Sequence, residues 1–78
     1  MEDLPGMDIK EKVGQRIKEL RKELGYSQER LANEAEVDRT YVTDVENGRR
    51  NVSIEVLLKL ISALEISVKE FFNSKSFN

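Results

Sequence analysis

The sequence predicts an all-α fold, a compact bundle of about five helices. Three observations lead to this prediction. The chain has 78 residues, which places it near the lower size limit for a single hydrophobic core. Apolar residues recur at intervals of three and four along most of it, which is the period of an amphipathic helix. Serine or aspartate precedes each such stretch at the position where a side chain caps the free amides of a helix start.

The first helix is expected to begin after Asp8 and to end at Gly25. Asp8 and Glu11 have the spacing of a capping box, in which each side chain accepts a hydrogen bond from the backbone amide of the other residue. Gly25 can adopt the left-handed conformation that ends many helices. The apolar side of this helix is predicted to consist of Ile9, Val13, Ile17, Leu20 and Leu24.

Two short helices joined by a tight turn are predicted over about residues 27–48. Ser27 is the expected N-cap of a helix over 28–35, and Asp38 that of a helix from 39 to about 47, with Gly48 just past its end. Small and branched residues face inward in this prediction, and Ala32 lets the two helix backbones approach closely. The shared core of the pair would contain Leu31, Ala32, Val37, Val42 and Val45.

Two further helices complete the predicted bundle. Ser53 is expected to cap a helix with a wide apolar stripe, and Ser67 with Glu70 forms a second capping box for a C-terminal helix at about 67–73. The stripe is predicted to consist of Ile54, Leu57, Leu58, Ile61 and Leu64, with Val56 and Leu60 beside it. The predicted domain therefore spans 8–78, after a flexible tail over 1–7.

Composition excludes several classes of function. The chain has no cysteine and no histidine, so it lacks thiol nucleophiles, the commonest metal ligands and the usual general base near neutral pH. We expect no enzyme activity, no cofactor and no small-molecule ligand. Apolar runs are far shorter than the roughly 18 residues of a membrane span, which favours a cytoplasmic protein. The formal net charge of -2 does not by itself indicate a nucleic-acid binder.

The outer face of the second short helix is the candidate functional surface. While Val42 and Val45 face inward, a different set of side chains is left outside, namely Arg39, Thr40, Thr43 and Asp44. An α-helix fits the major groove of B-DNA, and residues near its N-terminus reach the edges of the bases.

The stretch SQERLANEAEVDRTYVTDVENG over residues 27–48 resembles the helix-turn-helix of the phage Cro and repressor family. More narrowly, DRTYV at 38–42 and VENGRRN at 45–51 are similar to the controller proteins of bacterial restriction-modification systems. The resemblance spans nearly the whole chain. It implies a lambda-repressor-like DNA-binding domain that regulates transcription from a pseudo-palindromic operator. The alternative is an antitoxin or anti-regulator, a protein-binding module with the same fold.

The resemblance also implies roles for individual residues. Bases of double-stranded DNA would be contacted by Arg39, Thr40, Thr43 and Asp44. The sugar-phosphate backbone would be contacted by Ser27, Gln28, Tyr41, Arg49, Arg50 and Asn51. Two positions depart from the family pattern. Glu36 stands in the turn, where it would need a left-handed backbone unless the turn differs slightly. Asp44 would repel phosphate unless it accepts from cytosine N4 or pairs with an arginine.

Apolar residues near the C-terminus suggest a homodimer, with two dimers on adjacent sites as a further option. One short helix cannot easily hide all of them, so the expected dimer interface comprises Ile66, Val68, Phe71, Phe72 and Phe77. At least one of Phe71 and Phe72 is expected to complete the core of the monomer instead.

Overall fold

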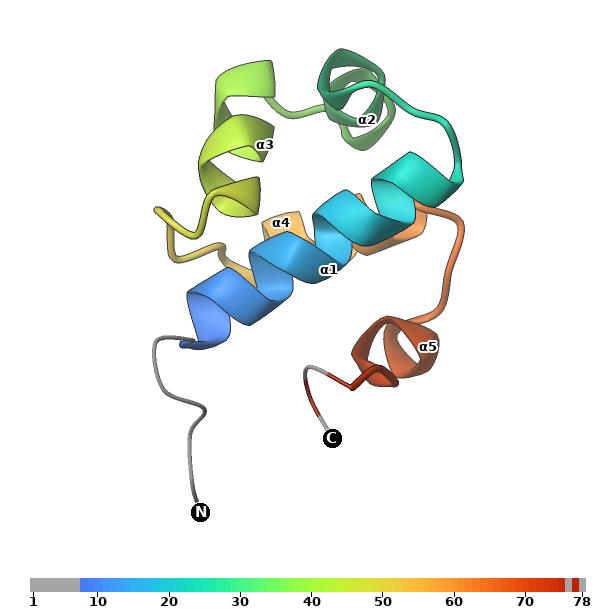
Figure 1. Cartoon of the computed structure of the whole chain (residues 1–78). Helices are drawn as coiled ribbons and strands as arrows, with labels where there is room; N and C mark the ends of the chain where they lie inside the picture. Colours follow the sequence, from blue (N-terminus) through green and yellow to red (C-terminus); the bar gives the residue numbers. More distant parts are fainter. Residues whose placement is uncertain (1–7, 76, 78) are drawn as a thin grey trace.

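A computed structural model describes residues 8–75 and 77, and over these residues it contains five α-helices and no β-strand. The helices are α1 (Ile9–Glu23), α2 (Gln28–Ala35), α3 (Arg39–Glu46), α4 (Ile54–Ala63) and α5 (Val68–Phe72). In Figure 1, α1 crosses the centre of the molecule, α2 and α3 lie above it, α5 lies below, and α4 lies behind. Helix α3 packs against α1 and α2, while α4 packs against α2 and α5. The all-helical fold is as predicted.

The polar residues expected at the helix starts occupy those positions. Asp8 accepts from the amide of Glu11, whose carboxylate accepts from the amide of Asp8 in return. Ser27 and Ser67 each accept from the amide three residues later, as does Ser53. Asp38 is the exception, because it holds the N-cap position of α3 but its side chain makes no capping hydrogen bond. Local sequence therefore sets where the helices begin.

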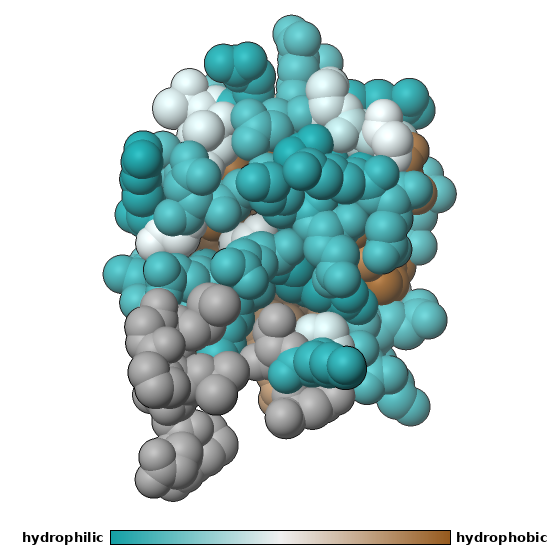
Figure 2. Space-filling model, viewed as in Figure 1, coloured by the Kyte–Doolittle hydropathy of each residue, from teal (hydrophilic) through white to brown (hydrophobic). Residues whose placement is uncertain are grey.

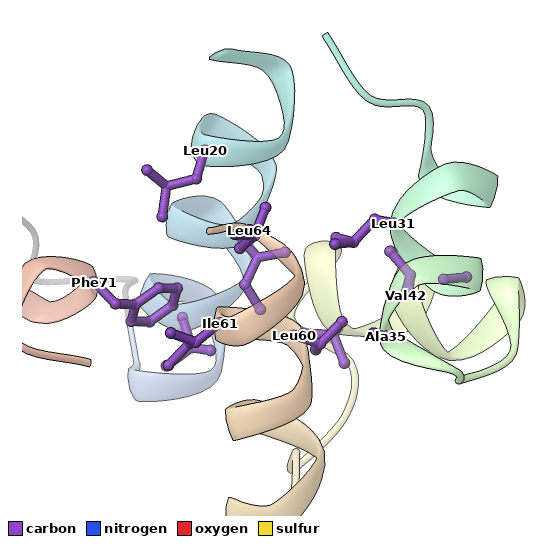
Figure 3. Packing of buried hydrophobic residues seen from close by; sticks show 12 residues of the cluster. Leu20, Leu31, Ala35, Val42, Leu60, Ile61, Leu64 and Phe71 are labelled. Atoms are coloured by element: carbon purple, nitrogen blue, oxygen red, sulfur yellow. The ribbon is translucent and has the colours of Figure 1, made fainter. Parts of the chain in front are cut away.

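The core lies where the inner faces of all five helices meet (Figure 3). It consists of Val13, Ile17, Leu20, Leu31, Ala32, Ala35, Val42, Val45, Leu60, Ile61, Leu64 and Phe71. The predicted apolar side of α1 was too long, since Ile9 is 60% exposed and Leu24 is 38% exposed. Ile9 is the first residue of α1, and Leu24 is its C-cap, just past the last residue of the helix.

The buried face of α4 differs from the predicted stripe. Leu60 is fully buried together with Ile61 and Leu64, although the pattern placed it beside the stripe. Ile54 and Leu58 are 78% and 48% exposed, so their assignment to the buried face was wrong. Ile54 is the first residue of α4 and lies beyond its neighbours, while Leu58 lies on the opposite side of the helix from Leu60. A helix that is apolar around much of its circumference does not indicate which side its partners will cover.

Helix α5 closes the bundle through Phe71, which is 0% exposed and points toward Ile61 in Figure 3. Arg16 of α1 secures this helix, because its Nε donates to the carbonyl of Phe71 at 2.7 Å and its Nη2 to the carbonyl of Glu70 at 2.9 Å. Phe71 therefore has no surface to offer a partner, and its assignment to a dimer interface is corrected. The expectation that at least one of the two phenylalanines completes the core is confirmed.

The turn between α2 and α3 contains Glu36 in the left-handed conformation, with φ 60° and ψ 43°. This is the left-handed backbone that the resemblance to the family implied for Glu36, and it is strained for a residue other than glycine. Glu65, just after α4, also has a positive φ. None of the helices in the described part of the chain has the length and apolar character needed to cross a membrane.

Candidate nucleic-acid interface

The outer face of α3 carries the predicted base-contacting residues. Arg39 and Thr40, in the first turn of the helix, are exposed. Thr43 and Asp44, one turn further along, are half-buried because each already contacts a neighbouring side chain. Val42 and Val45 face the core, as predicted. The structure thus brings the four residues to one side of α3, with the exposed pair at its N-terminal end.

Asp44 pairs with Arg50 of the loop after α3, across 3.5 Å between Oδ2 and Nη2. The guanidinium of Arg50 also lies over the ring of Tyr41, 4.4 Å from its centroid. The carboxylate that departs from the family pattern thus has an arginine partner, which was one of the two arrangements considered for it. Tyr41, Asp44 and Arg50 form one cluster on the surface, and a cation over an aromatic face is an attractive arrangement.

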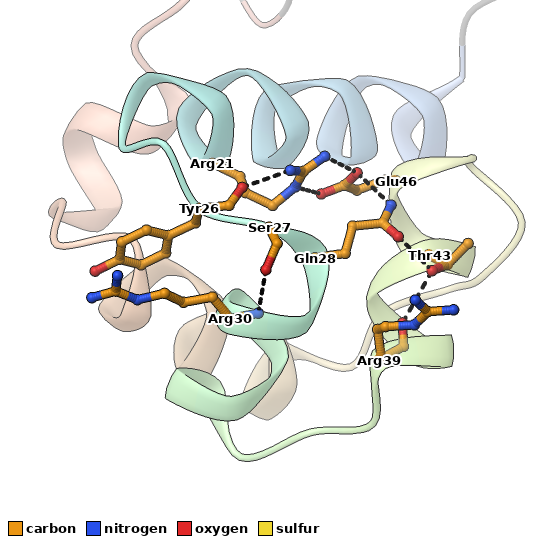
Figure 4. Close-up of polar contacts among 8 residues, drawn as sticks. All are labelled: Arg21, Tyr26, Ser27, Gln28, Arg30, Arg39, Thr43 and Glu46. Carbon is orange, nitrogen blue, oxygen red and sulfur yellow. Dashed lines mark hydrogen bonds and ion pairs between the residues drawn. The ribbon is translucent and has the colours of Figure 1, made fainter.

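A buried ion pair lies behind the outer face (Figure 4). Arg21 of α1 donates from Nε to Glu46 Oε2 at 2.6 Å and from Nη2 to Glu46 Oε1 at 3.0 Å. Its Nη1 donates to the carbonyl of Tyr26 at 2.8 Å. Both charged residues are buried, so the pair depends on these hydrogen bonds to offset the cost of removing charge from water. It fixes the end of α3 relative to α1.

Gln28 links this ion pair to the outer face of α3. Its Nε2 donates to Glu46 Oε1 at 3.0 Å, and its Oε1 accepts from the hydroxyl of Thr43 at 2.9 Å. The Thr43 hydroxyl also lies 3.1 Å from the carbonyl of Arg39. Figure 4 shows Gln28 of α2 and Thr43 of α3 reaching toward each other across the gap between the helices. The start of α2 and the middle of α3 are therefore held in one register.

The other candidates for backbone contact lie at the two ends of this surface. Ser27 is exposed at the N-terminus of α2, where its hydroxyl accepts from the amide of Arg30 at 2.9 Å. Arg49 and Asn51 are exposed in the loop after α3. Tyr41 is half-buried beneath Arg50. Ser27 thus lies at a helix start and Arg49 and Asn51 lie in the loop after α3, whereas Tyr41 lies in the first turn of α3.

Sequence reasoning missed Arg21, although a signal for it exists. Arg21 comes four residues after Ile17 and eight after Val13, so it lies on the buried stripe of α1. A charged residue at a core-facing position requires a buried partner of opposite charge. Glu46, which is not among the expected DNA contacts, is that partner.

The remaining residues of the expected dimer interface differ in exposure. Val68 is 46% exposed, whereas Ile66, Phe72 and Phe77 are half-buried and pack against the core. The rings of Phe72 and Phe77 meet edge to face, with centroids 4.9 Å apart. Figure 2 shows a mainly hydrophilic face with small, separate apolar areas.

The fold and this surface define a helix-turn-helix protein. Residues 17–71 match the family model described as Helix-turn-helix, and the chain belongs to this family. The control protein C.MunI from a Mycoplasma species is 45% identical over 67 residues, which cover 85% of this chain and 90% of that protein.

Two solved structures of controller proteins are also similar to this chain. The restriction-modification controller protein C.AhdI from Aeromonas hydrophila is 51% identical with a TM-score of 0.78, and the match covers 81% of this chain and 96% of that one. The C.Esp1396I tetramer in complex with its natural 35 base-pair operator is 38% identical with a TM-score of 0.81, and the match covers 85% of this chain and 87% of that one. The sequence resemblance to controller proteins is confirmed.

Proposed function

We propose that this protein is a restriction-modification controller protein, which binds a pseudo-palindromic operator as a homodimer and regulates transcription. The observation that carries the proposal is the exposed N-terminal end of α3, where Arg39 and Thr40 project from a rigidly packed helix pair. A relative with the same fold forms a tetramer on operator DNA. The role requires no catalytic group, and it places the protein in the cytoplasm with its operator.

Base reading is assigned to the outer face of α3. The planar fork of Arg39 suits the O6 and N7 atoms of guanine, and Thr40 offers a hydroxyl and a methyl group to the next base pair. Thr43 and Asp44 lie one turn deeper along the helix. Asp44 can accept from cytosine N4 only if it exchanges its contact with Arg50. Arg39 therefore supplies the main sequence preference in this proposal.

Backbone binding is assigned to the two ends of the surface. Gln28 uses one N–H of its amide on Glu46, which leaves the second N–H for a phosphate oxygen beside the N-terminus of α2. Ser27 lies next to it. On the other side, Arg50 above Tyr41 would contact the sugar-phosphate backbone together with Arg49 and Asn51. Contacts on both sides of α3 would hold the helix in the groove.

Dimerisation is assigned to the surface around the start of α5. Val68 offers exposed apolar area, and Ile66, Phe72 and Phe77 lie half-buried beside the core. A twofold dimer would set the two recognition helices about 34 Å apart, in successive major grooves. Dimers on adjacent sites would then fill the operator cooperatively.

The test is selection of binding sites from randomised duplex DNA, followed by affinity measurements on the selected operator. Arg39→Ala should weaken specific binding by about 1 to 3 kcal/mol per half-site and relax the preference at one base pair. Lys59→Ala on α4 is the matched control, because it also removes one positive charge from an exposed side chain. An unchanged preference in Arg39→Ala rules out its role. Failure to bind any duplex at low salt would favour the protein-binding alternative.

A further inference from the structure

We propose that the buried Arg21–Glu46 pair sets the direction of every hydrogen bond out to Thr43, so that the Thr43 hydroxyl accepts from DNA and does not donate to it. Thr43 would then select base pairs that present an exocyclic amine in the major groove, which is N6 of adenine or N4 of cytosine. The inference rests on the proposed function, because it requires that Thr43 faces a base. It makes Gln28 and Glu46 positioning residues for specificity.

The direction of these hydrogen bonds is fixed at their buried end, at Glu46. A carboxylate paired with arginine can only accept hydrogen bonds, and Glu46 accepts from Arg21 through both of its oxygens. The atom of Gln28 that lies 3.0 Å from Glu46 Oε1 must therefore be the amide nitrogen. With the nitrogen directed inward at Glu46, the carbonyl oxygen of Gln28 is directed at Thr43.

The orientation of the Gln28 amide then fixes the direction of its hydrogen bond with Thr43. The Gln28 oxygen has no proton, so the Thr43 hydroxyl must donate across the 2.9 Å between them. The alternative position of this proton, toward the carbonyl of Arg39 at 3.1 Å, also ends on a protein oxygen. A hydroxyl has one proton and two lone pairs. Among the described residues none donates to the Thr43 oxygen, which is left able to accept from outside the protein.

This polarity distinguishes bases. In the major groove adenine N6 and cytosine N4 are donors, whereas guanine O6, guanine N7 and thymine O4 are acceptors. A hydroxyl whose proton is retained by the protein can bond to the first group only. The methyl group of Thr43 could favour thymine independently of the hydroxyl, so the test must separate the two groups.

Thr43→Val makes that separation, because valine keeps the methyl group and the shape but has no hydroxyl. Base preference is measured at every operator position by selection from randomised duplexes and then by competition binding. Wild-type protein should prefer an amine-bearing base at one position of each half-site. Thr43→Val should lose that preference by about three- to tenfold, the size expected for one neutral hydrogen bond. Thr43→Ser, which keeps the hydroxyl, should retain it.

Glu46→Gln tests the origin of the polarity. The short contact with Arg21 Nε should hold the oxygen of the new amide. Its nitrogen then replaces Oε1, so that the bond from Arg21 Nη2 is lost and the Gln28 amide reverses to accept from this nitrogen. The Gln28 nitrogen then donates to the Thr43 oxygen, and the Thr43 proton is shared between the carbonyl of Arg39 and an acceptor base in the groove. The preference for an amine-bearing base at the Thr43 position should therefore fall by a similar factor, while the Arg39 position stays unchanged.

The outcomes are distinguishable. Unchanged preference at all positions in Thr43→Val would overturn the proposal, as would a wild-type preference for guanine or thymine at the position that Thr43→Val relaxes. Retention of the wild-type preference by folded Glu46→Gln would show that the ion pair does not set the polarity, and this also overturns it. If Glu46→Gln does not fold, the two Thr43 variants decide, because neither alters the ion pair. Absence of any duplex binding would instead refute the proposed function.

Discussion

Gly14 in the middle of α1 lies directly against the backbone carbonyl of Val45 in α3. A Cβ at position 14 would overlap that carbonyl oxygen and would also lie 3.1 Å from the carbonyl carbon of Glu46. These neighbours are backbone atoms near the end of α3 and cannot move away as a flexible side chain would. The close approach of the two helices places Glu46 within reach of Arg21. Helix α3, the proposed DNA-facing helix, therefore takes its position from a residue that has no side chain.

Gly14→Ala should destabilise the fold. Alanine favours a helix over glycine by about 1 kcal/mol, but forcing a methyl group against packed backbone costs about 1 to 3 kcal/mol or more. We expect the clash to dominate, with a net loss of about 1 to 2 kcal/mol in the free energy of unfolding from urea denaturation. A gain in stability would contradict the close packing of α1 on α3.

Gly25→Ala is the control for that experiment. Gly25 has a φ of +74° with open space where a Cβ would lie, so alanine there should cost only the left-handed strain of about 1 kcal/mol. Comparing the two variants in DNA binding is more informative still. Gly25→Ala should leave operator affinity unchanged under conditions where both proteins are folded, whereas Gly14→Ala should lower it by displacing α3.

The Arg21–Glu46 pair predicts strong non-additivity. Arg21→Met or Glu46→Leu alone leaves one buried charge without its partner and should cost about 3 to 5 kcal/mol. The double variant removes both charges and should lose much less than the sum. Thermal unfolding followed by circular dichroism gives the double-mutant cycle. Additive losses would mean that the two residues act independently, against the two hydrogen bonds that join them.

Local signals in the sequence predicted the helix starts and the α2–α3 turn, whereas long-range packing decided the rest. Ser27 and Asp8 cap helices through contacts within three residues, and such contacts can be predicted from spacing alone. The buried side of α4 depends on where α2 and α5 lie, so Ile54 and Leu58 could not be assigned from the pattern of their own helix. Arg21 was missed because its partner lies 25 residues away.

In the candidate site, too, the local sequence pattern predicted some features, and the packing of the helices determined the others. The helical period of α3 predicts which residues lie on its outer face, and it placed Arg39 and Thr40 there correctly. The pairing of Asp44 with Arg50 was one of two alternatives, because the path of the loop after α3 is not encoded by a periodic pattern. The link from Gln28 to Thr43 depends on the crossing of two helices, and only the three-dimensional arrangement supplies it.

Glu36→Gly should raise stability. Glycine relieves the left-handed strain of about 1 to 2 kcal/mol at φ 60°, while the extra freedom of the unfolded chain costs up to about 1 kcal/mol. The expected gain is therefore up to about 1 kcal/mol in urea denaturation. Glu34→Gly is the matched control, since it removes the same charge from an ordinary helical position and should destabilise by about 1 kcal/mol. A loss of stability in Glu36→Gly would contradict the strain.

Val68→Lys should weaken the homodimer. Val68 is the most exposed residue of the proposed interface, and burying an uncompensated ammonium group in an apolar contact is unfavourable. Sedimentation equilibrium should show a rise of at least about tenfold in the dimer dissociation constant, which corresponds to about 1.4 kcal/mol. Ile54→Lys is the comparison. Ile54 is even more exposed than Val68, but it lies at the N-terminal end of α4, whereas α5 follows the C-terminal end. If only Ile54→Lys dissociates the dimer, the interface lies at the start of α4 and the assignment to α5 fails.

The pairing of Arg50 with Asp44 predicts that substitutions of the two residues have coupled effects on DNA affinity. In the free protein the two side chains pair across 3.5 Å and both are partly exposed. Binding a phosphate through Arg50 therefore requires the arginine to exchange or share its carboxylate partner. Arg50→Ala would remove the proposed phosphate contact and leave Asp44 unpaired beside the DNA backbone, so affinity for every duplex should fall. The slope of log affinity against log salt should become shallower by about 0.9, the value for one lost phosphate contact.

Asp44→Asn separates the two roles proposed for the aspartate. If its main role is to neutralise Arg50, the variant should bind all duplexes more tightly, and Arg50→Ala combined with Asp44→Asn should recover part of the affinity that Arg50→Ala loses. If Asp44 instead accepts from cytosine, the variant should lose preference at one base pair and gain nothing elsewhere. Fluorescence anisotropy over a salt series, on the selected operator and on an unrelated duplex, distinguishes these results. Because the contact at 3.5 Å joins two partly exposed groups, we expect the first result with a modest coupling, below about 1 kcal/mol. Additive effects on both duplexes would show that the pair does not regulate the availability of Arg50.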